Sequence, residues 1–387
     1  MTSHTKTKVA VLYRVKQHWR VPIFERLAAH EKYSVKVFHG CDFPGTKVLN
    51  SKSSHTFQAK KMVSIPLRLR TSNGDALMPL SPFLFFELMR FKPDIILCEG
   101  ASNLANNLQA YMYAFLFRAK TIQWGLGEIQ DRQKSRTRKM LDGTIEIIER
   151  ASSACLSYSN YGKRYYQRVG VKEEKTFVAV NVVDTDKIKE RKAGFDVSQL
   201  FKEAHCHFDF NILFVGALTE PKRVDLLVRA FHKLQKNLDK RLSLTIVGDG
   251  PCRVKLVELV EELGIENVEF CGKVVDGVSR YFLQSDVFVL PGLGGLAVSE
   301  SLAHGLPVIS GVGDGCEKDL LSHGGGIFDE KLDEESLVNH LARLIENPNE
   351  LSAMKDAAEN TIEDVHNINT YISSVVECLD YVSEIKK

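Results

Sequence analysis

Short apolar runs alternate with segments of helical periodicity along the whole chain, in two successive series. In the first series the apolar runs predict strands at residues 8–14, 33–40, 93–100, 120–125, 152–159 and 175–181. Between them, residues 21–30 and 81–91 carry apolar positions at the spacing of an amphipathic helix. Strands that are apolar at nearly every position are typical of a parallel sheet covered by helices on both faces.

The second series restarts the same alternation after a charged segment. It predicts strands at residues 210–218, 242–250, 267–274, 286–292 and 306–313, helices between them at 224–237 and 253–264, and closing helices near 333–346, 349–365 and 368–386. The chain is therefore predicted to be α/β, with two tandem doubly wound, Rossmann-like domains. Because open sheets of this type bind ligands at the carboxyl ends of their strands, we expect the two domains to face a cleft.

The charged segment between the two series predicts the domain boundaries. Residues 1–185 form the expected first domain, 186–205 the linker and 206–366 the second domain.

The eight cysteines are scattered without a CxxC pair, which favours free thiols in a reducing cytoplasm and argues against a zinc site. No apolar run approaches the ~20 residues needed to span a bilayer, and the polar N-terminus does not resemble a signal peptide. We expect a cytoplasmic protein.

The small net charge of +2 hides a strong asymmetry between the two halves. Residues 1–190 contain 31 basic and 17 acidic residues, whereas the remainder contains 20 and 32. Either the first half faces an anionic partner, or the two halves attract each other and the charges are simply solvated. The cluster at 132–139, with Lys60, Lys61, Arg68 and Arg70, suits peripheral contact with an anionic membrane or a lipid-linked diphosphate, and equally suits a solvated face. The basic half lacks interleaved aromatics, so nucleic acid is not an expected partner.

Residues 291–309 carry the strongest chemical signal. A short strand runs into a glycine-rich turn and then a helix, and glycines at such a turn let a ligand touch the backbone. The free N–H groups and positive end of the helix suit a phosphate. Glu300 lies on the same helix face as Leu296 and Ala303, where a carboxylate is costly without a partner. A pair of ligand hydroxyls would provide that partner.

Glycine also follows the other strands of the second series, in the segments 216–223, 248–251, 271–274 and 292–297. One such glycine only marks a turn, but four around one sheet indicate a ligand lying across its rim. Lys222, beside Arg223, precedes the first helix of this domain, where a cation can neutralise a diphosphate and stabilise a leaving group. An isolated lysine in a polar turn would instead be solvated.

The segments 215–231, 245–251, 269–274 and 291–309 resemble family 4 of the GT-B glycosyltransferases in order and spacing, and residues 181–184 resemble the end of that family's first domain. The resemblance covers about residues 175–328. It implies a GT-B architecture in which a final helix, residues 367–387, crosses back onto the first domain. It also implies transfer of a sugar from a UDP- or GDP-linked donor with retention of the anomeric configuration, and no cofactor or metal is required.

The same resemblance implies roles for individual residues. Lys222 pairs with the donor diphosphate and Glu300 binds the ribose hydroxyls, so both count as catalytic candidates. The remaining donor-binding positions are Gly216 and Arg223 after the first strand, Gly248 and Asp249 lining the cleft, Val274 at the nucleobase, and Gly295, Leu296 and Ala297 at the helix tip.

The sequence departs from the family pattern at three places. Gly292 stands where the family carries a glutamate that contacts the donor sugar, and Ala217 stands where an arginine is frequent, for which Arg223 is a substitute. The glycine-rich loop after the first strand is absent from residues 13–24. An inactive relative that only binds nucleotide sugar therefore stays an alternative. A second alternative is an NAD(P)-dependent oxidoreductase, because residues 292–297 fit GxGxxG/A and Asp314 follows about 20 residues later.

The first half contains the residues expected to bind the acceptor, and its motifs are less specific than those of the second half. Arg14 and Arg20 follow the first strand, and Trp124 and Glu128 follow a later one. Trp124 could stack on a sugar ring and Glu128 could take a proton from an acceptor hydroxyl, or they are a core tryptophan and a surface glutamate. The expected acceptor is a glycan or lipid-linked precursor in polysaccharide, O-antigen or capsule biosynthesis, met at the inner face of the cytoplasmic membrane.

Overall fold

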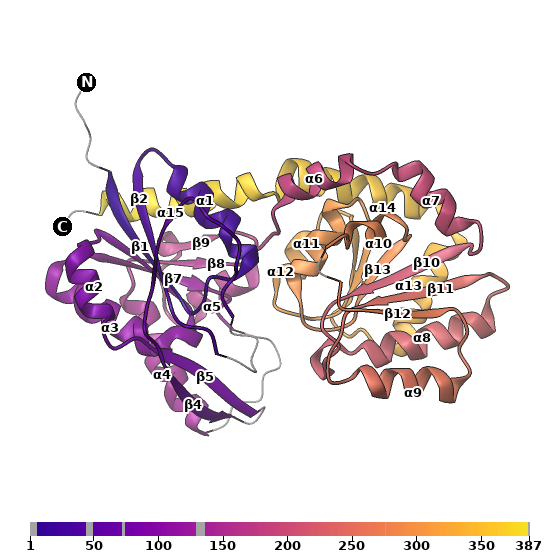
Figure 1. The fold of residues 1–387 in the computed structure, drawn as a ribbon, viewed down its shortest axis with the longest axis horizontal. Coiled ribbons are helices and arrows are strands. Elements are labelled where there is room, and N and C mark those ends of the chain that lie inside the picture. Colours follow the sequence, from indigo (N-terminus) through magenta and orange to yellow (C-terminus); the bar gives the residue numbers. More distant parts are fainter. Residues whose placement is uncertain (1–5, 44–48, 72–73, 129–135, 275, 386–387) are drawn as a thin grey trace. The chain divides into compact units, whose positions relative to one another are not determined.

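The computed structural model describes residues 6–43, 49–71, 74–128, 136–274 and 276–385 (Figure 1). The chain divides into two compact units: unit 1 comprises residues 1–179 with 369–387, and unit 2 comprises residues 180–368. The expected linker at 186–205 instead forms two helices of unit 2, α6 (Thr185–Ala193) and α7 (Val197–His205). Ile188 of α6 is buried, so this charged segment is nevertheless anchored in a core.

Unit 1 is built on a parallel sheet with the strand order β3-β2-β1-β6-β7-β8-β9. Its strands are β1 (Thr7–Tyr13), β2 (Tyr33–His39), β3 (Gln58–Lys61), β6 (Ile95–Glu99), β7 (Lys120–Gly125), β8 (Ala154–Ser157) and β9 (Thr176–Val178). A separate antiparallel hairpin, β4 (Ile65–Thr71) and β5 (Gly74–Leu80), interrupts the alternation. The sequence analysis missed this hairpin and β3, whose short strand is mostly exposed and lacks an apolar run.

The helices of unit 1 are α1 (Val21–Ala29), α2 (Leu84–Phe91), α3 (Leu104–Phe117), α4 (Arg136–Ala151), α5 (Asn160–Arg168) and α15 (Ile368–Glu384), with the 3₁₀ turns η1 (His18–Arg20), η2 (Ala101–Asn103) and η3 (Glu173–Lys175). Helices α2 and α3 pack on the central strands through a cluster that contains Leu88, Ala110 and Ile96. The C-terminal helix α15 belongs to unit 1, where its Asp380 accepts hydrogen bonds from Tyr33 and Lys32.

Unit 2 repeats the architecture with the parallel strand order β12-β11-β10-β13-β14-β15. Its strands are β10 (Phe210–Val215), β11 (Leu242–Val247), β12 (Val268–Gly272), β13 (Val287–Leu290), β14 (Val308–Ser310) and β15 (Gly326–Phe328). Its further helices are η4 (Glu220–Lys222), α8 (Val224–Asn237), α9 (Arg253–Leu263), α10 (Ser279–Leu283), α11 (Gly295–Ala303), α12 (Cys316–Leu321), α13 (Glu334–Glu346), α14 (Pro348–Asn360) and the π-helical turn η5 (Thr361–Val365).

The strand order of unit 2 reverses direction between β10 and β13, its two central neighbours. In open α/β sheets, the crevice for a ligand lies outside the carboxyl ends of the strands at such a reversal. The fold therefore predicts a ligand-binding site at the loops after β10 and β13. The α/β class and the two Rossmann-like halves predicted from the sequence are confirmed.

Candidate functional site

The loop after β10 packs directly on the turn between β13 and α11. The N–H of Leu293 donates to the Pro221 carbonyl oxygen at 2.9 Å, which ties η4 to the glycine-rich turn. A Cβ added at Gly292 would overlap that same carbonyl oxygen. Gly292 is thus a position where the backbones of two loops meet, and a larger residue there would have to displace η4.

The ends of β10, β11 and β12 are joined in the same backbone-on-backbone manner. The N–H of Gly216 donates to Val247 at 2.9 Å, and the N–H of Gly248 donates to Gly272 at 2.8 Å. A Cβ on Gly248, whose φ is +145°, would overlap the carbonyl oxygen of Gly216. The glycine segments at these strand ends therefore pack main chain against main chain, and a ligand lying across this rim stays a prediction.

Lys222 extends from η4 to the beginning of α11. Its ammonium nitrogen lies so close to Gly294 that a Cβ added there would overlap it, and its Cε would be 3.7 Å from a Cβ added at Gly216. A lysine beside a helix N-terminus places two positive groups together, because the helix dipole is positive at that end. This arrangement favours an anion between the strand ends and the helix.

Asp314 supplies one negative group at that point. Its carboxylate accepts hydrogen bonds from the N–H of Gly295 at 3.1 Å and of Cys316 at 3.3 Å. Glu317 fixes the loop by accepting from the N–H groups of Asp314 and Gly315, both at 2.8 Å. Burial and the neighbouring Asp314 raise the pKa of Glu317 to about 7. The sequence analysis considered Asp314 only as part of a dinucleotide fingerprint and did not predict that it caps α11.

Leu296 and Ala297 follow in the first turn of α11 and are half-buried. The first N–H groups of a helix have no partner within the helix, so these two amides point out of its N-terminus. Glu300, one turn further, is half-buried as well, and burial raises the pKa of its carboxyl against the opposing effect of Arg191. Within the part of the chain that the structure describes, its carboxylate makes no hydrogen bond. The ribose hydroxyls inferred from the sequence as its partner stay a prediction.

The other residues predicted to bind the donor lie on the loops after β10, β11 and β12. Asp249 is exposed after β11, and its carboxylate accepts from the N–H of Gly250 at 2.8 Å. Val274 is half-buried just after β12. Arg223 adopts a left-handed conformation with φ of 52° and lines a groove with Asp225 of α8 and Lys255 of α9. Lys222 does not line that groove, so the two adjacent cations serve different surfaces.

On the acceptor side, two predictions need correction. Arg20 is only 2% exposed and Trp124 is fully buried. The Arg20 guanidinium donates to the hydroxyls of Tyr13 and Tyr371, each at 2.9 Å, and its carbon lies 4.6 Å from the ring centroid of Tyr158 and 5.1 Å from that of Trp124. Trp124 is the core tryptophan of the alternative interpretation. Neither side chain can reach a sugar, because aromatic rings enclose both.

The remaining first-half candidates are engaged in ion pairs. Arg14 pairs with Glu99, with its Nε 3.1 Å from the carboxylate, and Glu128 pairs with Arg168. In the basic cluster, Lys60 lies 3.7 Å from Glu87 and Lys61 lies 3.2 Å from Asp42. Residues 132–135 and the side chains of residues 136–139, Arg68 and Arg70 lie outside the described part. The roles expected of Arg14 and Glu128 stay predictions.

Two kinds of feature are absent from the described residues. No group of three or more His, Cys, Asp or Glu side chains there could hold a metal ion. None of the helices is both long and apolar enough to cross a membrane.

Comparison with known proteins identifies the class. Residues 199–361 match the family model of Glycosyl transferases group 1. The chain is 22% identical over 296 residues to an uncharacterized glycosyltransferase, MJ1069, of Methanocaldococcus jannaschii, which covers 73% of this chain and 74% of that one. It is 35% identical over 134 residues to N-acetyl-alpha-D-glucosaminyl L-malate synthase of Bacillus anthracis, with 33% and 34% covered.

Among solved structures, Anabaena Alr3699/HepE in complex with UDP superposes with a TM-score of 0.73 and 16% identity, covering 97% of this chain and all of that one. The lipopolysaccharide outer core galactosyltransferase WaaB superposes with a TM-score of 0.66 and 16% identity, covering 96% and 99%. The chain has the GT-B fold of these solved structures. Its residues 199–361 match the glycosyl transferases of group 1, which supports a transferase.

Proposed function

We propose that this chain is a retaining, family 4 glycosyltransferase that moves a sugar from a UDP- or GDP-linked donor to a hydroxyl of a glycan or lipid-linked acceptor. The observation that carries the proposal is the position of Lys222 beside the N-terminus of α11, with a half-buried Glu300 one turn further whose carboxylate makes no hydrogen bond among the described residues. A nucleoside diphosphate offers an anion to the lysine and the helix N-terminus, and a pair of hydroxyls to the carboxylate of Glu300.

In this proposal the donor diphosphate lies against the glycine rim. Lys222 and the amides of Leu296 and Ala297 bind its oxygens, and Gly216 allows close approach of the main chain. Glu300 accepts hydrogen bonds from the ribose hydroxyls. Asp249 and Val274 border the diphosphate and the base. HepE has been solved in complex with UDP and with UDP-glucose, which is consistent with a donor of this class.

The chemistry follows from where charge develops. The bond between the anomeric carbon and the diphosphate oxygen breaks, a bond from that carbon to the acceptor oxygen forms on the same face, and the acceptor proton passes to the departing phosphate. Lys222 and the helix amides stabilise the negative charge on the leaving group. Removal of one such preorganised contact costs on the order of 10²–10³ in rate. These groups provide the charge stabilisation without a metal ion.

Asp314 completes the proposal where the family glutamate is missing. Gly292 has no side chain and no room for one, because the Pro221 carbonyl fills the space. Asp314 places a carboxylate on the N-terminus of α11 beside Gly295. We assign to it the recognition of a hydroxyl of the transferred sugar. The acceptor belongs to unit 1, whose basic character suits a glycan precursor in polysaccharide, O-antigen or capsule biosynthesis at the inner face of the cytoplasmic membrane.

The test begins with thermal shifts of the full chain against UDP, GDP, their sugar conjugates and NAD(P). The best donor is then used in hydrolysis and transfer assays with wild type, Lys222→Ala and Glu300→Gln. We expect both variants to lose at least about a hundredfold in turnover while their circular dichroism stays unchanged. Lys236→Ala, an exposed lysine at the far end of α8, is the matched control and keeps full activity.

Three results would contradict the proposal. Unchanged turnover in both Lys222→Ala and Glu300→Gln would contradict the assignment of the donor site to these residues. A shift by NAD(P) alone would favour the oxidoreductase. Binding of a nucleotide sugar without hydrolysis or transfer to any acceptor would favour the inactive relative that the loss of the glutamate at position 292 suggests.

A further inference from the structure

Helices α2 and α3 of unit 1 carry large apolar side chains on their outward sides as well as on their inward sides. The inward residues include Leu84, Leu88 and Tyr113, which are buried in the core. The outward residues, which together we name the α2–α3 face, are Phe83, Phe86, Met89, Leu108, Met112, Phe115, Leu116 and Phe117, and all of them are exposed. A helix that is apolar all round is normally buried.

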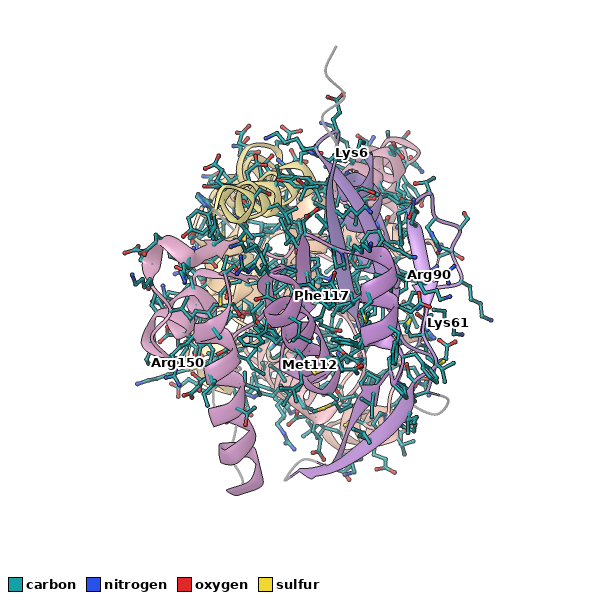
Figure 2. All side chains as sticks on the ribbon, turned by 90° about the vertical axis from the view of Figure 1, so that its left-hand side faces the viewer. Lys6, Lys61, Arg90, Met112, Phe117 and Arg150 are labelled. Carbon is teal, nitrogen blue, oxygen red and sulfur yellow. The ribbon has the colours of Figure 1, made fainter. Side chains whose placement is uncertain are left out.

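The exposed residues of the two helices form one surface because the helices are packed side by side. The ring of Phe85 in α2 lies edge-on to Tyr113 of α3, with centroids 6.2 Å apart, and Phe117 stacks on Tyr113 at 4.8 Å. The N–H of Phe85 also donates to the side chain of Gln109 at 3.4 Å. Figure 2 shows Met112 and Phe117 in the middle of this side of unit 1.

The exposure of this face is costly in water. Phe115 is 85% exposed and Phe86 is 65% exposed, so most of their ring surface contacts solvent. Contiguous apolar patches of this kind on monomeric proteins mark binding surfaces for proteins or membranes. The choice between those two partners depends on the charges around the patch.

The charges at the ends of α2 and α3 are mostly positive, with Asp94 as an acidic neighbour two residues after Lys92. Helix α3 contains no acidic residue, and the only one in α2, Glu87, lies 3.7 Å from Lys60. Arg90, Lys92 and Arg118 are exposed at the helix ends, and Figure 2 shows Arg90 and Lys61 to one side of Met112 and Arg150 to the other. Long cationic side chains at the edge of an apolar surface extend to charged headgroups while their stems remain in apolar surroundings.

Two of these cations occupy backbone positions that usually belong to glycine. Helix α2 ends at Lys92 with φ of 55°, and α3 ends at Arg118 with φ of 57°. The left-handed conformation strains a residue with a Cβ by roughly 1 kcal/mol or more. Both helices nevertheless terminate with a cation next to the same patch. Their last carbonyls benefit from the charge, and the edge of the face gains two long basic side chains.

We propose that the α2–α3 face binds the surface of an anionic phospholipid bilayer. The phenylalanine, leucine and methionine side chains enter the boundary between headgroups and acyl chains, and the arginines and lysines contact the lipid phosphates. A second copy of the chain is disfavoured, because a twofold interface would bring the same cations of both copies together. The inference rests on the proposed function only in that the bilayer would present a lipid-linked acceptor. Binding itself needs no nucleotide.

The experiment is co-flotation of the full-length protein with vesicles of phosphatidylcholine alone and with about 30% phosphatidylglycerol. Wild type should float with the anionic vesicles and poorly with the neutral ones. The triple variant Phe86→Ser, Phe115→Ser, Phe117→Ser should bind at least about tenfold more weakly, because burial of the rings drives insertion. Arg90→Gln with Arg118→Gln should lose about fivefold per cation on anionic vesicles only. Val254→Ser, 66% exposed on α9 of unit 2, is the matched control and should float like wild type.

Two further measurements separate this proposal from its competitors. Sedimentation velocity without lipid should show wild type and the triple variant in the same oligomeric state. A wild-type dimer that the triple variant dissociates would overturn the proposal in favour of a second copy, and equal flotation of wild type and triple variant would overturn it outright. The thermal shift by the donor nucleotide should be unchanged in the triple variant. Flotation of a protein that transfers no sugar would contradict the proposed function, and the proposal that the α2–α3 face binds a membrane would be kept.

Discussion

The two units place a cation just after the central strand of similar sheets, and the two cations have opposite surroundings. Lys222 of unit 2 follows β10 and extends over glycines at the start of a helix. Arg20 of unit 1 follows β1 and is enclosed by Tyr13, Trp124 and Tyr158. The same topology thus yields a half-exposed cation beside bare backbone in one unit and a buried structural cation in the other.

The difference shows that the neighbours of a cation, more than its place in the fold, decide its role. Lys222 lies beside Gly216 and Gly294, which have no side chains, so main chain borders its ammonium group. Around Arg20 the tyrosine hydroxyls and ring faces satisfy the guanidinium, and burial together with these contacts leaves no route to solvent. Cation–π contacts are strongest when desolvated, as they are here.

Arg20→Ala tests the structural side of this contrast and should have the largest effect. Loss of the buried guanidinium leaves a cavity and unsatisfied tyrosine hydroxyls, at a cost of about 4 kcal/mol in the free energy of unfolding. Urea denaturation followed by circular dichroism measures it. Nucleotide binding below the transition should persist. A wild-type unfolding curve for this variant would contradict the structural role.

Gly292→Ala tests the close packing of main chain on main chain beside Lys222 in unit 2. The added methyl group must push η4 away from the β13–α11 turn, and overpacking of this kind costs about 2 kcal/mol. Because Lys222 belongs to η4, donor affinity measured by calorimetry should fall by more than tenfold. Gly143→Ala, which meets no atom within 4 Å and lies in α4, is the matched control and should stabilise the protein slightly.

Asp314→Asn separates sugar recognition from nucleotide binding at the same helix end. Loss of the carboxylate should weaken binding of the donor sugar nucleotide by about tenfold relative to the free nucleotide, since one charged hydrogen bond contributes roughly 1.5 kcal/mol. Parallel titrations with UDP and with the UDP-linked sugar provide the ratio. An unchanged ratio would exclude a contact between Asp314 and the sugar.

Glu149→Gln probes the acidic group buried in unit 1 through the pH dependence of stability, with no effect expected on the donor site. Burial raises the pKa of Glu149 to about 8, against the opposing hydrogen bond from Tyr165. The folded state therefore holds the proton more tightly than the unfolded state, so this stabilisation is complete below pH 4.5 and declines as the pH rises towards 8. The variant should match wild type near pH 4 and exceed its unfolding free energy by several kcal/mol at pH 9, because each unit of pKa shift corresponds to about 1.4 kcal/mol. Equal differences at both pH values would contradict this origin.

The sequence predicted the parts of the molecule that local patterns determine. The apolar runs at 210–218 and 242–250 contain β10 and β11, and the glycine segments mark where their ends meet. The hairpin β4–β5 alternates polar and apolar residues at 65–70, so a period-two signal was present and overlooked.

Other features depend on contacts between distant positions, and local patterns do not contain them. The burial of Arg20 requires Tyr158 and Tyr371, which are far away along the chain. The cap that Asp314 places on α11 joins residues 19 positions apart. The lack of space at Gly292 comes from Pro221, in a loop that the sequence alone cannot position.

The helix α15 has a consequence for synthesis on the ribosome. Its Tyr371 receives a hydrogen bond from Arg20, 351 residues earlier, and its Asp380 anchors Tyr33. The domain whose strands emerge first thus acquires this helix only after the intervening domain has been made. In nascent chains the amino-terminal half should therefore stay incomplete for most of elongation. Until Tyr371 has been made, the guanidinium of Arg20 lacks the hydrogen bond to its hydroxyl.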